Sequence, residues 1–274
     1  MYKIVALDLD ETLLDLNKNC CERNLKAIAK AQELGVKIVP SSGRTPGFLG
    51  TTLEDLNINK ENEYCILGNG AIVVDNKTNE AIFCAPIPFE IVLELFQFGK
   101  EHNVGVQIFT PENVYFWFTK DEEWNRIAHL GNNLIRRFDD SCDDLKDKTI
   151  IKMLYQRPDM PFLKELEKEL RPITDKRITT SFSSGRYLEL NQFGIHKGVG
   201  LKALADHLRI DIKDTIGIGD NYNDMELIRH AGLGCAVANA IDEVKEISSY
   251  VCESDCAQGG VAEVIENFIL NPTN

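Results

Sequence analysis

Apolar and polar residues alternate along the first part of the chain with the periods of buried strands and amphipathic helices. YKIVALDLD (2–10) begins as a continuous apolar run, which is typical of a strand buried on both faces of a parallel sheet. NLKAIAKAQELG has apolar residues at helical spacing and a final glycine, and so predicts a helix that ends at Gly35. VKIVPSS (36–42) then predicts a second strand.

The next segments continue this alternation. Thr45 and Pro46 supply an N-cap and a first-turn proline for a helix expected to run through Leu56. YCILGNGAIVV (64–74) reads as a third strand, and a hairpin is expected around Asn76 to Asn79. A βαβαβ order of this kind favours a right-handed, parallel α/β domain.

The middle of the chain has a different pattern, which begins at the proline-marked junction APIPFE (85–90). A helix is expected up to about His102, followed by helices mixed with four strands: VGVQIFT, NVYFWFT, TIIKMLYQ and RITTSFS. That mixture suits an α+β unit with an antiparallel sheet. Its aromatic run, Tyr115 to Phe118, is interpreted as sheet core.

From YLELN (187–191) onward, predicted strands and helices alternate again. The predicted strands cover 215–220 and 234–238, and the predicted helices cover 198–209, 223–232, 242–247 and 259–269. The simplest architecture is a Rossmann-like, parallel-sheet α/β core domain built from residues 1–84 and 185–274. An α+β domain, residues 85–184, is then inserted into it.

Composition narrows the possible partners. The formal net charge of −13 argues against nucleic acid and anionic membranes, which require a basic surface, but leaves room for a local cationic pocket. The eight cysteines lack paired CxxC spacing and are interpreted as free thiols. No apolar run reaches membrane-spanning length, and the N-terminal run is broken at Asp8, unlike a signal peptide. We therefore expect a cytoplasmic protein; nothing in the sequence indicates an oligomeric state.

Polar residues gather where the predicted strands end. Asp8 and Asp10 would point the same way from their strand, and their mutual repulsion costs stability unless a cation or a proton is present. Ligands of parallel sheets bind at the carboxyl ends of the strands. The other candidates at those ends are Ser41, Ser42, Gly43, Arg44, Asp220, Asn221, Asn223 and Asp224. Clustered carboxylate and amide oxygens favour Mg²⁺, which would in turn recruit phosphate.

Each of these features has an ordinary structural explanation when taken alone. Asp-x-Asp is often a strand-end turn, and Lys197, although disfavoured at a helix N-terminus by the dipole, could be a solvated surface residue. GIGDNYND lacks the third glycine of a dinucleotide loop, and GxxxxGK[ST] does not occur. The five histidines have no ligand spacing and are expected at the surface or in the core. The convergence of several strand ends is what favours a site.

Four segments, DLDETLL, PSSGR, HKGVG and GDNYND, occur in the order of the motifs of the haloacid dehalogenase-like superfamily. GNGAIVVD and QGGVAEVI further resemble its Cof-type subgroup, in which a large α/β cap is inserted between the second and third motifs. The resemblance spans the whole chain. One departure is Glu11, where the family usually has glycine.

The resemblance implies a role for each matching residue. Asp8 matches the nucleophile that forms an aspartyl-phosphate, and Asp10 matches the general acid and base. Ser42 and Lys197 match the groups that bind and stabilise the phosphoryl group, with Gly43, Arg44 and Asn223 also expected at the phosphate. Mg²⁺ is expected on the Asp8 side chain, the Asp10 backbone carbonyl and Asp220, with Asp224 supporting that set.

The function implied is a Mg²⁺-dependent phosphatase of small phosphorylated metabolites, with sugar phosphates as the expected class. A phosphosugar mutase with the same phosphoaspartate chemistry is the alternative enzyme. A sensor that binds without turnover is a third reading, disfavoured because a sensor needs no nucleophile. The inserted domain would close over the site as a cap and contact the rest of the substrate.

Overall fold

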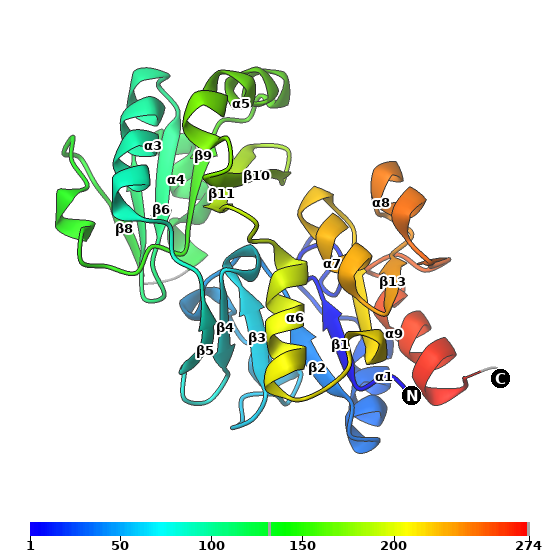
Figure 1. Ribbon diagram of the computed structural model, residues 1–274. Coiled ribbons are helices and arrows are strands. Elements are labelled where there is room, and N and C mark those ends of the chain that lie inside the picture. Colours follow the sequence, from blue (N-terminus) through cyan, green and yellow to red (C-terminus); the bar gives the residue numbers. More distant parts are fainter. Residues whose placement is uncertain (131–132, 273–274) are drawn as a thin grey trace. The chain divides into compact units, whose positions relative to one another are not determined.

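The computed structural model describes residues 1–130 and 133–272, and the chain divides into two compact units (Figure 1). The first unit comprises Met1–Gly43, Thr51–Phe83 and His196–Asn274, and the second comprises Arg44–Gly50 and Cys84–Ile195. The expected fold class, a parallel-sheet α/β core with an inserted α+β domain, is confirmed. Within the described residues, no helix has the length and apolar character needed to cross a membrane.

The first unit is built on a five-stranded sheet in the order β14-β13-β12-β1-β2, in which every pair is parallel. Its strands are β1 (Ile4–Leu7), β2 (Lys37–Pro40), β12 (Thr215–Gly219), β13 (Leu233–Ala236) and β14 (Tyr250–Val251). The central strand β1 is fully buried, as its unbroken apolar run predicts. Because the strands are parallel, their carboxyl ends share one edge of the sheet.

The helices of this unit follow the strands in the sequence. They are α1 (Glu22–Glu33), α2 (Thr52–Asp55), α6 (Lys197–His207), α7 (Met225–His230), α8 (Asp242–Ile247) and α9 (Gly260–Ile265). Single turns flank them: η2 (Gly68–Gly70), η5 (Ile212–Asp214), η6 (Tyr222–Asp224) and the π-helical η7 (Glu266–Leu270). The helix expected from Thr45 through Leu56 is wrong, because the segment forms the turn η1 (Pro46–Phe48) and then the short α2.

The expected single strand over residues 64–74 is also wrong. It is a hairpin of β3 (Tyr64–Leu67) and β4 (Ile72–Asp75), and β5 (Ala81–Cys84) completes a three-stranded sheet after the expected turn. The break falls at Gly68, Asn69 and Gly70, all of which have positive φ. Glycine and asparagine tolerate a left-handed backbone better than other residues, so the GNG triplet is the part of the sequence that indicates this turn.

The second unit has a six-stranded sheet in the order β10-β11-β9-β6-β7-β8, antiparallel except for the β7–β8 pair. Its strands are β6 (Gly105–Phe109), β7 (Val114–Trp117), β8 (Leu134–Arg136), β9 (Lys152–Gln156), β10 (Ile178–Ser183) and β11 (Tyr187–Gln192). Its helices are α3 (Phe89–Glu101), α4 (Asp121–Ile127) and α5 (Met160–Thr174), with turns η3 (Ala128–Leu130) and η4 (Asp143–Leu145).

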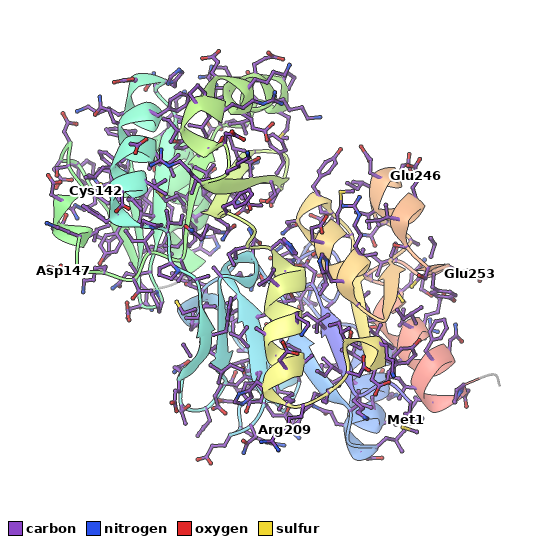
Figure 2. The ribbon with its side chains drawn as sticks, viewed as in Figure 1. Met1, Cys142, Asp147, Arg209, Glu246 and Glu253 are labelled. Carbon is purple, nitrogen blue, oxygen red and sulfur yellow. The ribbon has the colours of Figure 1, made fainter. Side chains whose placement is uncertain are left out.

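One hydrophobic core lies between this sheet and the helices α3 and α5. It includes Trp117, Tyr155 and Cys142, and Figure 2 labels Cys142. The domain boundary expected at residue 184 differs from this arrangement. β11 pairs with both β9 and β10, so the second unit continues to Ile195. The apolar alternation of YLELN does not reveal which sheet the segment joins, so the sequence pattern alone places it in the core domain.

Candidate active site

Two carboxylates meet at the carboxyl edge of the five-stranded sheet. Asp8 directly follows β1, and Asp220 directly follows the neighbouring strand β12. The backbone N–H of Asp8 donates to the carbonyl of Ile218 (3.0 Å), which continues the β1–β12 pairing beyond the strand. Both side chains are buried, with 6% and 5% of their surface exposed. The sheet register therefore brings together residues more than two hundred positions apart in the sequence.

Lys197 is buried between two carboxylates. It is the first residue of α6 and is fully buried, and its Nζ lies 2.5 Å from Asp8 Oδ1 and 2.5 Å from Asp224 Oδ1. The interpretation as a solvated surface lysine is therefore wrong. Its position at a helix N-terminus opposes the dipole, and the two carboxylates compensate for that cost.

Asp224 holds the turn after β12 in place. Its Oδ2 accepts hydrogen bonds from the backbone N–H groups of Asp220 (3.0 Å) and Asn221 (3.1 Å), while Oδ1 faces Lys197. The turn also requires Gly219, because a Cβ there would lie 2.3 Å from the Asp224 Cβ. Since Asp224 is occupied by these partners, it is suited to orienting its neighbours rather than to reacting.

The start of α6 is fixed by the η2 turn of the β3–β4 hairpin. Gly70 has φ +94°, and a Cβ at this position would lie 2.2 Å from the His196 carbonyl oxygen. On the opposite side of the contact, a Cβ at Gly200 would meet Ile66 at 2.4 Å and the Gly70 Cα at 3.0 Å. The glycines of GNG and HKGVG thus allow the close approach that sets the position of Lys197.

The buried cluster is short of positive charge. Burial is the main reason that the pKa of Asp8 is raised to about 7, despite the opposing effect of Lys197. Burial, followed by the charges of Asp224 and Asp8, raises the pKa of Asp220 to about 9. Burial alone would lower the pKa of Lys197, but the two carboxylates outweigh it and raise the pKa. With all groups ionised, three carboxylates and one ammonium carry two excess negative charges.

A divalent cation fits this arrangement. Oxygen atoms of Asp8, Asp220 and Asp224 lie within 4.8 Å of one another, and all three residues are buried. The Thr12 hydroxyl donates to Asp220 Oδ1 (2.6 Å) and so fixes the orientation of that carboxylate. A hard, all-oxygen donor set with two uncompensated charges suits Mg²⁺. Asp8 and Asp220 are the side chains best placed as ligands, with Asp224 behind them.

Asp10 and Glu11 lie next to this cluster but in a different environment. The Asp10 carboxylate is 38% exposed and pairs with Lys18 Nζ (2.7 Å), so it differs from the buried Asp8. Glu11 is exposed and has φ +66°, the left-handed region that favours glycine. Its side chain does not fill the buried cluster, and its carbonyl accepts from Asn239 Nδ2 (2.7 Å). The departure from glycine therefore affects backbone strain at this position.

Ser42 and Asn223 lie at the same edge of the first unit. Ser42 follows β2 and is buried, with its N–H donating to the Ile66 carbonyl and its carbonyl accepting from the Asn69 N–H. Asn223, in η6, donates through Nδ2 to Asn69 Oδ1 (3.4 Å). Asn69 therefore connects two of the predicted phosphate-binding residues.

The remaining two predicted residues fall on either side of the division between the units. Gly43 ends the first segment of the first unit, whereas Arg44 begins the segment assigned to the second. The Arg44 guanidinium donates to the Phe48 carbonyl (3.2 Å).

Sequence reasoning missed Thr12 and Asn69. Thr12 lies inside the quoted DLDETLL motif, and its position two residues after Asp10 was the available signal. Asn69 was hidden inside a segment predicted as one strand, although an asparagine between two glycines indicates a left-handed turn.

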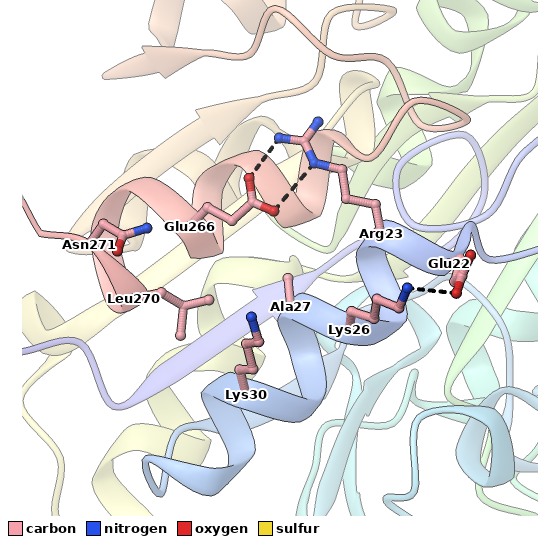
Figure 3. Close-up of a pocket in the computed structure, with 8 residues that line it drawn as sticks. All are labelled: Glu22, Arg23, Lys26, Ala27, Lys30, Glu266, Leu270 and Asn271. Carbon is pink, nitrogen blue, oxygen red and sulfur yellow. Dashed lines mark hydrogen bonds and ion pairs between the residues drawn. The ribbon is translucent and has the colours of Figure 1, made fainter.

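A pocket of about 600 Å³ lies elsewhere in the first unit, between α1 and the C-terminal η7 (Figure 3). Arg23 there pairs with Glu266 (2.7 Å), and Lys26 pairs with Glu22 (2.7 Å). These are exposed ion pairs of small energetic value, and the pocket lacks the buried charge of the Asp8 cluster. The carboxylate cluster is therefore the candidate active site.

Comparison with known proteins identifies the family of the chain. The family model for haloacid dehalogenase-like hydrolases matches residues 5–265. The 5-amino-6-(5-phospho-D-ribitylamino)uracil phosphatase YcsE of Bacillus subtilis is 28% identical over 98% of this chain and 96% of its own. An HMP-PP phosphatase of Yersinia pseudotuberculosis is 26% identical over 99% and 97%. A haloacid dehalogenase-like hydrolase structure from Bacteroides thetaiotaomicron, 28% identical, superposes with a TM-score of 0.82 over 97% and 99%.

Proposed function

The chain belongs to the haloacid dehalogenase-like hydrolases, and we propose that it is a Mg²⁺-dependent phosphatase that hydrolyses small phosphomonoesters through an aspartyl-phosphate. The observation that carries the proposal is the buried Asp8 carboxylate held 2.5 Å from a fully buried lysine. A nucleophilic carboxylate needs a fixed orientation and a neighbouring cation for the incoming phosphate, and this pair supplies both.

The two aspartates of the first motif divide the chemistry between them. Asp8 attacks phosphorus, so that a bond forms between its carboxylate oxygen and phosphorus while the bond to the substrate oxygen breaks. Asp10, which is partly exposed, donates a proton to the leaving alkoxide and then removes one from the water that hydrolyses the aspartyl-phosphate. Lys197 stabilises the charge on the transferring group, and Ser42 and Asn223 hydrogen-bond its oxygens.

Asp8, Asp220 and the Asp10 backbone carbonyl would hold Mg²⁺, which when bound offsets the negative charge of the carboxylates and the phosphate. Thr12 and Asp224 keep the ligand carboxylates oriented before substrate arrives. Such outer partners typically change metal affinity by about 10–100-fold when removed.

We propose that the second unit determines which substrate is accepted. One face of its sheet packs on α3 and α5, and the opposite face carries Lys152 and Glu189, a buried ion pair at 2.6 Å. The Ser183 hydroxyl donates to Glu189 (2.5 Å), and the Nε2 of Gln107 is buried without a hydrogen-bond partner. A polar sheet face of this kind suits the hydroxyl groups of a sugar phosphate, a class consistent with the phosphoribityl compound in the name of YcsE.

Phosphate release tests the proposal directly. The purified protein is assayed with sugar phosphates, nucleotides and an aryl phosphate, with Mg²⁺ and then with excess chelator. Chelator-sensitive release that is lost in Asp8→Asn is the expected result. Release that persists in Asp8→Asn would overturn the assignment of Asp8 as the nucleophile, and turnover that requires a sugar bisphosphate would identify a mutase.

All eight cysteines are free thiols, which supports our placement of this activity in the cytoplasm.

A further inference from the structure

A second group of metal-type ligands lies on the helices that carry Lys197 and follow Asp224. One ligand atom each from His196, Glu226 and His230 lies within 4.8 Å of the others. The two imidazole rings are 4.8 Å apart between centroids, and His230 Nδ1 is 3.5 Å from Glu226 Oε2. The sequence alone does not indicate this group, because the two histidines are 34 positions apart and only Glu226 and His230 have helical i,i+4 spacing.

The packing of α6 against α7 builds this group. The two helices lie side by side (Figure 1), and His196 is the N-cap residue of α6. Gly198 permits the approach, because a Cβ there would lie 2.4 Å from the Glu226 carbonyl oxygen and 2.8 Å from His230 Nδ1. The proximity of the three side chains is thus a consequence of a close helix contact that only glycine allows.

The hydrogen bonds of His196, Glu226 and His230 leave each side chain with an atom that could bind a metal ion. His196 Nδ1 is buried and makes no hydrogen bond, so no protein group competes with a metal ion for this nitrogen. Burial, followed by the charge of His230, lowers the pKa of His196. His230 Nδ1 lies 2.8 Å from the Glu226 carbonyl, a hydrogen bond that leaves Nε2 as the unprotonated nitrogen. Arg229 binds Glu226 Oε1 (2.5 Å), while Oε2 faces His230.

We propose that His196, Glu226 and His230 form a second metal site, which binds a borderline divalent transition metal such as Zn²⁺. Two imidazoles and one carboxylate are a donor set for Zn²⁺ and its neighbours, whereas Mg²⁺ prefers oxygen ligands. The chain would then hold two chemically distinct cations, Mg²⁺ on the Asp8 cluster and a transition metal here.

The consequence of occupancy follows from where the ligands are attached. His196 precedes Lys197, and Glu226 follows Asp224 by two residues, so a bound ion would tie α6 to α7 beside the buried ion pair. We therefore expect Zn²⁺ to raise the melting temperature of the protein by linkage to the folded state. This inference does not depend on the proposed phosphatase activity, because binding and melting are measured without substrate.

The test uses the full-length protein with saturating Mg²⁺, so that the oxygen site is filled, and in a Cys84→Ser background, because Cys84 is an exposed thiol that could bind Zn²⁺ itself. Zn²⁺ titration by calorimetry and visible absorption of Co²⁺ are the readouts. We expect one Zn²⁺ per chain and nitrogen-ligated Co²⁺ bands. His230→Gln, at an exposed position, should weaken binding by at least about tenfold and abolish the gain in melting temperature.

The matched control is His102→Gln. His102 Nε2 also faces a carboxylate, Glu169 at 3.2 Å, but this pair belongs to no cluster of three ligands among the described residues. The control should retain wild-type binding. Equal Zn²⁺ affinity in wild type, His230→Gln and His196→Gln would overturn the proposal. So would Zn²⁺ binding that is abolished by Asp220→Asn but unaffected by His230→Gln, because the ion would then occupy the carboxylate cluster.

Discussion

Replacement of Asp224 by asparagine separates the structural part of the site from its chemistry. The Asp224 carboxylate is fully buried and accepts three hydrogen bonds, one from Lys197 and two from backbone N–H groups. An amide has one acceptor oxygen and a donor nitrogen, so it must present a donor either to the ammonium or to the backbone. Breaking a buried ion pair in this way typically costs about 3–5 kcal/mol.

The melting temperature of Asp224→Asn, measured by calorimetry without Mg²⁺, should therefore fall by roughly 6–20 °C for a protein of this size. Asp10→Asn is the matched control, because Asp10 pairs with Lys18 in a partly exposed ion pair (side chains 38% and 54% exposed). That pair is worth about 1 kcal/mol or less, so the control should melt near the wild-type temperature. Its phosphatase rate should nevertheless fall by about 10²–10⁴-fold, since it loses the proposed acid and base.

The reasoning is refuted if Asp224→Asn melts within about 2 °C of the wild type, a shift that corresponds to less than about 1 kcal/mol. It is also refuted if Asp10→Asn melts as low as Asp224→Asn, because the burial of Asp224 would then not be the cause. Lys197→Met provides a second check on the same pair, since it leaves two buried carboxylates without their ammonium. Its stability should recover partly on addition of Mg²⁺.

Three further predictions follow from the same geometry. Thr12→Val removes the hydroxyl that orients Asp220 and should weaken Mg²⁺ binding by about 10–100-fold in a calorimetric titration, whereas Thr12→Ser should retain it. Burial raises the pKa of Asp8 to about 7 and that of Asp220 to about 9, so the metal-free folded state holds protons that the unfolded chain releases above about pH 4. Its unfolding free energy should therefore fall from about pH 4 to 9, and the stabilisation by Mg²⁺ should grow over the same range; a flat profile would contradict the assignment. Glu11→Gly should leave activity intact and raise the melting temperature slightly, because a left-handed backbone costs a residue with a Cβ about 1 kcal/mol and glycine avoids that cost.

The strand ends of the first unit could be predicted because parallel strands impose one geometry. An apolar run followed by Asp8, and another followed by Asp220, are enough to place both carboxylates at one edge of a sheet. The contacts between helices could not be predicted in this way. The HKGVG motif marked Lys197 as a site residue through the family resemblance, but its burial depends on Gly70 and Gly200, which belong to segments far apart in the sequence.

The errors in the predicted fold have a related cause. The hydrophobic pattern of residues 64–74 does not distinguish one long strand from two strands joined by a left-handed turn, and only the GNG triplet carries that information. The pattern of β11 likewise fits either sheet, because alternation specifies the face that is buried but not the partner strand. His196 and His230 likewise lie together because α6 packs against α7, a contact that one sequence without an alignment does not reveal.

The charge arrangement of the cluster explains why the fold maintains a costly group of residues. Buried carboxylates repel one another and lose hydration, so an apolar replacement of the set would be expected to stabilise the metal-free protein. Lys197 offsets only part of that cost, as the raised pKa values of Asp8 and Asp220 show. In the proposed function, the remaining negative charge would be the source of affinity for a divalent cation. With that cation bound, the site would be able to accept a phosphate, which the carboxylates alone would repel. The cost of burying these carboxylates and the proposed activity of the cluster therefore have one electrostatic origin.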